Sequence, residues 1–176
     1  MTEDTLAQNP SSQESEMEAQ RSMIVADKSY MEAQLVVAKS VVDGTYKEQE
    51  ATANLDAAKR NFTDNARRLL ETYTENEYNA AVMYTNTWTT AFDKVADEYN
   101  KIMLARATGQ TVDTKVITEL DNTIQVNLKP TTEGMYDFSK MTKEDAAKAV
   151  AELEKKITAA QHAIDAYDVS IGNINL

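Results

Sequence analysis

The only histidine of the chain, His162, is the first residue to consider for metal binding or proton transfer. In helical bundles that hold two iron ions, a metal-binding histidine follows a glutamate by three residues, but position 159 is Ala159. Proton transfer in nucleophilic catalysis would also require a nucleophile and a group that orients the imidazole, and the sequence indicates neither. We therefore expect His162 to lie on a helix surface or at the edge of a packing face.

Carboxylates four residues apart on predicted helices are a second candidate, because two such side chains on one helix face can hold a divalent cation. The pairs are Glu14 and Glu18, Glu71 and Glu75, and Asp93 and Asp97. No EF-hand loop accompanies them, so solvated helix faces explain them better. The chain also has no cysteine, no glycine-rich phosphate-binding loop, no zinc-protease motif and no nucleophile elbow. We expect a protein that is not an enzyme and that uses no metal or cofactor.

One cluster of basic residues could bind phosphate or an acidic partner. It consists of Lys59, Arg60, Arg67 and Arg68, and the acidic residues one helical turn away are Asp56, Asp64 and Glu71. Opposite charges at this spacing pair along a helix. We therefore expect ion pairs within one helix rather than a binding site.

An aromatic group is the first of two candidate protein-interaction sites. Tyr84, Trp88 and Phe92 follow one another at four-residue spacing, with Tyr78 nearby. Aromatic residues of this kind are common at the energetic centre of protein interfaces. The alternative is that they pack another element of the same chain across the helix.

The second candidate is an apolar seam near the C-terminus. Its nine positions, from Ala146 to Ile174, step alternately by four and three residues, which is the 3.5-residue period of a coiled coil. The larger side chains of the seam, which we expect to contact another helix, are Val150, Leu153, Ile157, Ile164, Tyr167, Ile171 and Ile174. No Lys or Arg follows Lys156, so we expect the last turns to insert into an apolar site of this chain or of a neighbouring subunit.

Hydrophobic periodicity predicts the helices that carry these residues. Residues 1–12 are polar and predict a flexible arm, and residues 13–176 predict a single elongated helical domain. Its first helix covers residues 13–43 and Gly44 is expected to end it, although a helix that continues through the glycine is the alternative. Residues 46–108 contain neither Gly nor Pro and predict one long helix, with a break near residues 74–77 as the alternative.

Residues 110–141 predict a mixed insert. Asp113 is expected to cap a short helix, after which residues 123–128 alternate between apolar and polar side chains and indicate a strand. Residues 129–134 predict a loop and residues 135–138 a return strand, which together would make a β-hairpin. Thr142 then begins a capped helix that continues to residue 176.

The composition favours helices. The chain has four Gly and two Pro among 176 residues, too few for the frequent turns of a β-sandwich or barrel. The absence of Cys excludes zinc fingers and disulfide scaffolds, and a net charge of −11 disfavours nucleic-acid binding. No run of 18 apolar residues predicts a transmembrane segment, and residues 1–20 lack the features of a secretory signal peptide.

These observations predict a mainly all-α fold: an elongated helical hairpin or three-helix coiled-coil bundle with a small insert, containing a β-hairpin, at residues 110–141. The expected function is structural. We expect an acidic, oligomeric subunit that contacts other protein subunits through its helices, for example in the head, neck or tail of a phage virion.

The layout of the chain is also similar to that of the hydrophilic translocator and filament proteins of type III secretion. The shared features are a polar N-terminus without basic residues, a long helix, a small mixed insert and a capped helix over residues 142–176. This resemblance implies an exported filament or needle-tip subunit, secreted by a non-classical route. A third hypothesis is a cytoplasmic adaptor or chaperone-like module that uses the aromatic group as a peptide groove.

Overall fold

The computed structural model describes residues 10–76 and 87–174, and this part of the chain is helical and contains no β-strand. The elements are α2 (Pro10–Asp43), α3 (Glu48–Asn76), α4 (Thr87–Ala107), α5 (Thr114–Asn127), the 3₁₀ turn η1 (Phe138–Lys140) and α6 (Lys143–Ile174). The all-α class predicted from the sequence is therefore confirmed for the described residues.

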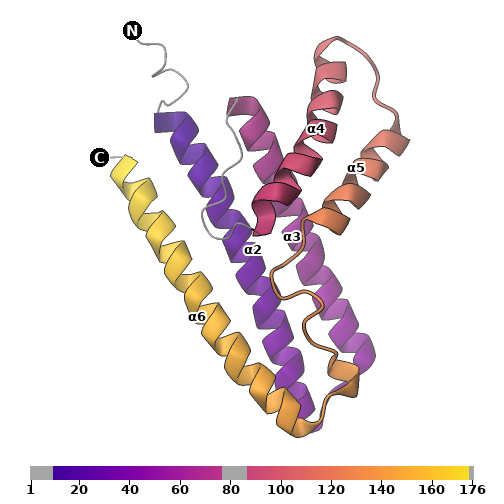
Figure 1. Cartoon of the computed structure of the whole chain (residues 1–176), viewed down its shortest axis with the longest axis vertical. Coiled ribbons are helices and arrows are strands. Elements are labelled where there is room, and N and C mark those ends of the chain that lie inside the picture. The colour runs from indigo at the N-terminus through magenta and orange to yellow at the C-terminus, as the bar shows by residue number, and fades with distance from the viewer. Residues whose placement is uncertain (1–9, 77–86, 175–176) are drawn as a thin grey trace.

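Helix α2 is the centre of the arrangement. Helix α6 packs along one side of α2 and α3 packs along another, while α4 and α5 form a helical hairpin beside α3 (Figure 1). From the end of α5 the chain returns along the long helices to the start of α6, near the loop that joins α2 to α3 (Figure 1). Three long helices thus share one axis direction, and the α4–α5 hairpin is attached to their side.

Gly44 ends the first helix because its backbone adopts φ +78°, a left-handed conformation that a side chain would strain. The amide of Thr45 then donates to the carbonyl of Ser40 at 2.8 Å, which satisfies one of the free carbonyls at the helix end. The helix thus stops where the sequence pattern indicated, and α3 starts after a short loop. At the other end α2 begins at Pro10, inside the segment expected to be a flexible arm, because proline suits the first turn of a helix.

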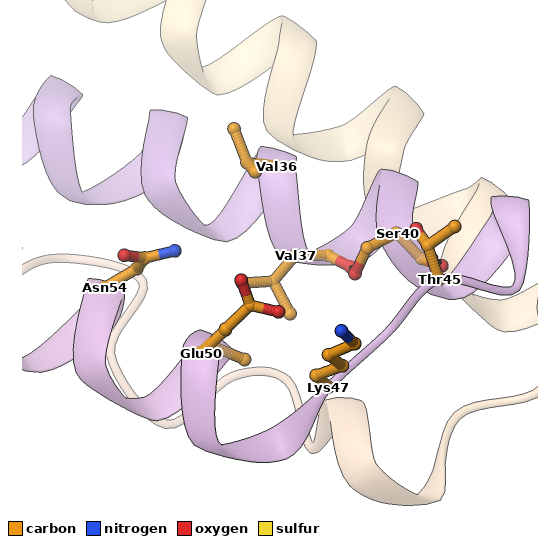
Figure 2. Close-up of a pocket in the computed structure, with 8 residues that line it drawn as sticks. Val36, Val37, Ser40, Thr45, Lys47, Glu50 and Asn54 are labelled. Atoms are coloured by element: carbon orange, nitrogen blue, oxygen red, sulfur yellow. Dashed lines mark hydrogen bonds between the residues drawn. The ribbon is translucent and has the colours of Figure 1, made fainter.

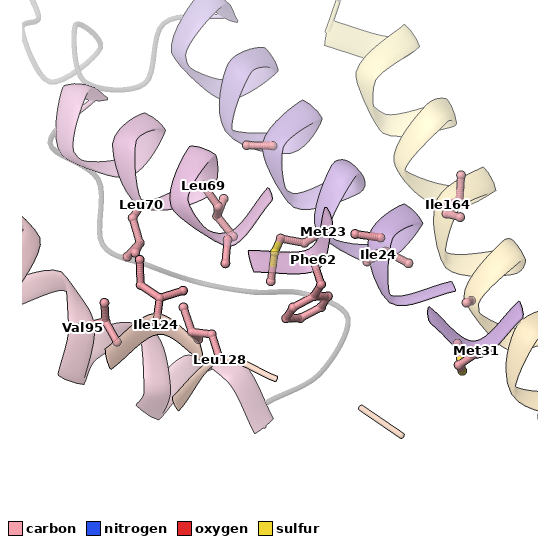
Figure 3. Close-up of a cluster of buried hydrophobic side chains, with 14 of the residues drawn as sticks. Met23, Ile24, Met31, Phe62, Leu69, Leu70, Val95, Ile124, Leu128 and Ile164 are labelled. Atoms are coloured by element: carbon pink, nitrogen blue, oxygen red, sulfur yellow. The ribbon is translucent and has the colours of Figure 1, made fainter. Parts of the chain in front are cut away.

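The hydrophobic core lies where α2, α3 and the α4–α5 hairpin meet. Met23 of α2 and Phe62 and Leu69 of α3 are fully buried there, and Ile124 of α5 and Leu128 approach them from the hairpin (Figure 3). Ile24 and Met31, also of α2, belong to the same cluster, and Ile164 of α6 lies toward α2 (Figure 3). One continuous cluster therefore connects all of the helices.

The single helix predicted over residues 46–108 is wrong, whereas the alternative of a break near residues 74–77 agrees with the end of α3. Helix α3 ends at Asn76, and a separate helix, α4, begins at Thr87 and packs back against α3 and α5. The sequence from Thr72 to Thr90 is rich in Asn and Thr, which are mediocre helix formers. Folding back also lets both helices bury an apolar face, which one straight helix of that length could not do within a single chain.

The predicted β-hairpin is also wrong. Residues 123–127 belong to α5, which starts after Asp113, whose side chain accepts a hydrogen bond from the amide of Lys115 at 3.0 Å. Leu120 and Ile124 are buried, whereas Val126 is 66% exposed. The apolar residues therefore follow the four-residue spacing of a helix face, and the period-two alternation is a coincidence of its last turn. Residues 135–138 are not a strand either: Phe138 starts η1 and stacks on Tyr136.

Candidate interaction site

The connection between α5 and α6 lies across α2 and α3, and its residues 129–137 are called the strap below. Beneath it, the Asp27 side chain of α2 is fully buried. The two carboxylate oxygens of Asp27 accept hydrogen bonds from the backbone N–H and the hydroxyl of Thr131, both at 2.8 Å. Burial raises the pKa of Asp27, and the two bonds from Thr131 oppose that rise.

Gln34, two helical turns after Asp27, holds the next residue of the strap. Its amide Nε2 donates to the backbone carbonyl of Thr132 at 3.0 Å, and the hydroxyl of Thr132 donates to its Oε1. Both side chains are buried, with Gln34 2% and Thr132 0% exposed. Asp27 and Gln34 lie seven residues apart on one face of α2. Their side chains form hydrogen bonds with two consecutive residues of the strap, Thr131 and Thr132.

Lys59 of α3 holds the third consecutive residue. Its Nζ lies 2.6 Å from Oε1 of Glu133, and both side chains are only partly exposed. Tyr30 of α2 is buried nearby. Its own burial, together with the negative charges of Glu133 and Asp56, raises its pKa to about 12.

Two residues of the basic cluster of α3 form ion pairs with other parts of the chain, not along the helix as the sequence predicted. Lys59 pairs with Glu133 of the strap, and Arg67 pairs with Asp121 of α5. Arg60 and Arg68 are exposed. Two of the four basic residues thus attach the hairpin and the strap to α3. Sequence reasoning missed these partners because they lie more than 50 positions away in the chain, and no local spacing signals such a pair.

The apolar seam of α6 faces α2. Leu153, Ile164 and Tyr167 are buried, whereas Val150 and Ile157 are half-buried on one flank of the seam. The partner helix is therefore one of the same chain, which was one of the two expectations. Ile171 and Ile174, in the last turns, are also half-buried.

Two polar contacts fix the end of α6. The hydroxyl of Tyr167 donates to Oε1 of Gln20 at 2.7 Å within the interface. The guanidinium of Arg21 lies beside the carboxylate of Asp168, with Nε at 2.6 Å from Oδ1. The last turns of α6 thus dock on the beginning of α2, even though no basic residue of α6 itself lies near them.

The aromatic candidates fall largely outside the described residues. Tyr84 lies outside them, and Trp88 and Phe92 belong to the first turns of α4, where the surroundings of their side chains are not described. The structure therefore neither joins these three residues into one group nor separates them. Farther along α4, Val95 and Tyr99 are buried in the core.

A second surface feature is a stripe on α2 that lies away from the strap, called the open face of α2 below. It consists of Ser15, Ser22, Ser29 and Val36, at intervals of seven residues, of which Ser15 and Val36 are exposed and Ser22 and Ser29 are half-buried. Its two ends border hollows between α2 and α3. One hollow has about 480 Å³ and is lined by Val36, Ser40 and Asn54 among others (Figure 2), and the other has about 270 Å³ and is lined by Ser15, Ser22 and Arg68 among others.

The remaining candidates show no assembled chemistry. His162 is exposed on α6, as expected from its position beside the seam. In the part of the chain that the structure describes, no three His, Asp or Glu side chains are grouped so that they could hold a metal ion. Within the same residues, no helix is both long and apolar enough to span a membrane.

Comparison with protein families, with curated proteins and with solved structures finds no match to this chain. Two features of the structure therefore remain as candidate sites. One is the strap with its polar contacts to α2 and α3, and the other is the open face of α2.

Proposed function

We propose that this chain is a non-enzymatic structural subunit that joins a larger assembly, such as a virion, through helix–helix contacts. The observation that carries the proposal is the open face of α2. It runs along the central helix of the molecule and includes Val36, whose side chain is 61% exposed. Val36 also lines the hollow of about 480 Å³ between α2 and α3, so a partner seated on this face would bury it.

The partner element that fits this face is a helix of another subunit. Serine at three of the four positions leaves room for a helix to approach α2 closely, and the seven-residue repeat matches the period with which helices pack side by side. The hollows at both ends of the open face give such a helix space beside α3. On the α6 side, Val150 lines a further hollow with Lys39 and Val42 and adds partly exposed apolar surface.

The mass of the protein in solution tests this proposal. We expect light scattering coupled to size exclusion to show a mass that rises with concentration. Val36→Asp should weaken the association by about tenfold or more, because it places an unpaired charge in the contact. The matched control is Val169→Asp, which adds the same charge at an equally exposed position on the outer side of α6 and should leave the association unchanged.

A protein that stays monomeric at every concentration would contradict the proposed assembly. An association that Val36→Asp and Val169→Asp weaken equally, or that neither changes, would show that the open face of α2 is not the contact.

A further inference from the structure

The strap is held by polar side chains in its middle and by apolar side chains at its two ends. Leu128, just before it, is fully buried, and Phe138, just after it, is 7% exposed. Between these anchors, Asp27, Gln34 and Lys59 each hold one strap residue. Pro130 is buried as well, but Thr131, Gly134 and Met135 are exposed. The two ends are thus held by apolar burial, whereas the exposed residues of the strap lie in the segment between them.

The groups beneath the strap are ones that water solvates well. A buried carboxylate loses its hydration, and the two hydrogen bonds from Thr131 are what the folded chain offers Asp27 instead. If the strap leaves, water can replace these bonds and also those of the Gln34 amide. At Asp27 and Gln34, opening therefore costs less than it would over an apolar surface, where nothing would compensate for the lost contacts.

The long helices do not depend on the strap for their packing. Helix α6 and helix α3 each contact α2 directly, and the core between α2 and α3 includes Met23, Phe62 and Leu69. We propose that the strap is a releasable latch: residues 129–137 leave α2 and α3 as one unit, between the anchors Leu128 and Phe138, while α2, α3 and α6 stay packed.

Release of the latch uncovers a polar surface of α2 and α3 with a defined chemistry. Asp27 accepts from an N–H and a hydroxyl, the Gln34 amide donates to a backbone carbonyl, and Lys59 faces a carboxylate. Any segment that takes the place of the strap has to offer these groups in series, as a Thr-Thr-Glu sequence does. The latch is a property of the single chain and does not rest on the assembly proposed above.

Hydrogen exchange followed by NMR tests the latch on the full-length protein, because the amide of Thr131 reports directly on its bond to Asp27. We expect this amide to exchange about tenfold faster, or more, than the amides of the buried α2 residues Met23 to Met31, after correction for intrinsic rates. Its exchange should also depend only weakly on low concentrations of urea, since little surface is exposed when the strap opens. Equal rates and equal urea dependence at Thr131 and in α2 would overturn the proposal.

A pair of matched variants isolates the latch contact. Thr131→Val removes the hydroxyl that donates to Asp27 but keeps the shape and the amide, and should speed exchange at position 131 by about tenfold while the α2 amides stay unchanged. Thr158→Val removes a hydroxyl that bonds within α6 and should leave position 131 as it is. If Thr131→Val fails to fold, Gln34→Met is the second variant. Unchanged exchange at position 131, or equal acceleration in α2, would contradict the latch.

Discussion

Asp27 is the residue in this protein whose burial is least expected from its type. Most fully buried carboxylates have a cationic partner. Both oxygens of Asp27 instead bond to the neutral Thr131. The raised pKa indicates that loss of hydration outweighs these two bonds. Since the pKa in the folded protein exceeds that in the unfolded chain, the folded state binds the proton more tightly, so ionisation of Asp27 destabilises the fold.

Asp27→Asn should therefore make the protein at least as stable as wild type at about pH 7, with a gain on the order of 1 kcal/mol in the free energy of unfolding. An asparagine can accept from the Thr131 amide and donate to its hydroxyl, so both contacts survive without a buried charge. The advantage should shrink as the pH falls through the raised pKa of Asp27, because the wild-type carboxyl is then protonated and its stabilising contribution is restored. Urea unfolding over this pH range measures the effect.

The matched control for this prediction is Asp64→Asn, which removes the same charge from an exposed position of α3. It should not reproduce the pH dependence. A loss of stability in Asp27→Asn at pH 7 that disappears as the pH falls would contradict the prediction, because it would mean that the charged form of Asp27 stabilises the fold.

At the scale of the helices, the sequence predicted those elements whose apolar pattern repeats many times. The seam of α6 has nine positions in register, and Gly44 supplies a helix stop that few other residues can provide. Residues 123–128 show too few repeats to separate a strand from the last turn of a helix. Val126 decides between them, since a strand would place it on the same face as Ile124, whereas α5 places it in solvent.

A pair of charge substitutions tests this assignment. Ile124→Asp should lower the free energy of unfolding by about 3 kcal/mol or more, because it buries an unpaired carboxylate in the core. Val126→Asp should change it by less than about 1 kcal/mol, because position 126 faces solvent. Chemical denaturation of both variants measures the difference. Similar losses in the two variants would restore the strand prediction, in which both side chains share one buried face.

The contacts of the strap could not be predicted from sequence patterns, for a different reason. Asp27, Gln34 and Lys59 look like ordinary polar residues of solvated helix faces, and their partners lie about 100 positions away for Asp27 and Gln34. Helical periodicity describes which residues share a face but not which distant segment covers it. The sequence therefore predicted the helices that carry the site but not the site itself.

At the scale of the whole molecule, α2 contacts α3, α6 and the strap, so the contacts along α2 determine how far these parts are coupled. Near its beginning it receives the last turns of α6 through Gln20 and Arg21, and near its middle it receives the strap through Asp27 and Gln34. The α6 contact buries an aromatic ring and the strap contact is polar. We therefore expect the end of α6 to contribute more stability than the strap does.

Deletion of residues 167–176 tests this order. It removes Tyr167, which is 4% exposed, and leaves Gln20 of α2 without the phenol that donates to it. We expect a loss on the order of 3 kcal/mol in the free energy of unfolding, as for other truncations of a buried aromatic side chain.

The control is deletion of residues 173–176, which keeps Tyr167 and should cost less than about 1 kcal/mol. Thermal and urea unfolding of the two truncated proteins and of Thr131→Val show which contact contributes more to the free energy of unfolding. If removing residues 167–176 costs no more than the Thr131 substitution, the last turns of α6 do not hold the beginning of α2, and the coupling of the molecule has to run through the strap.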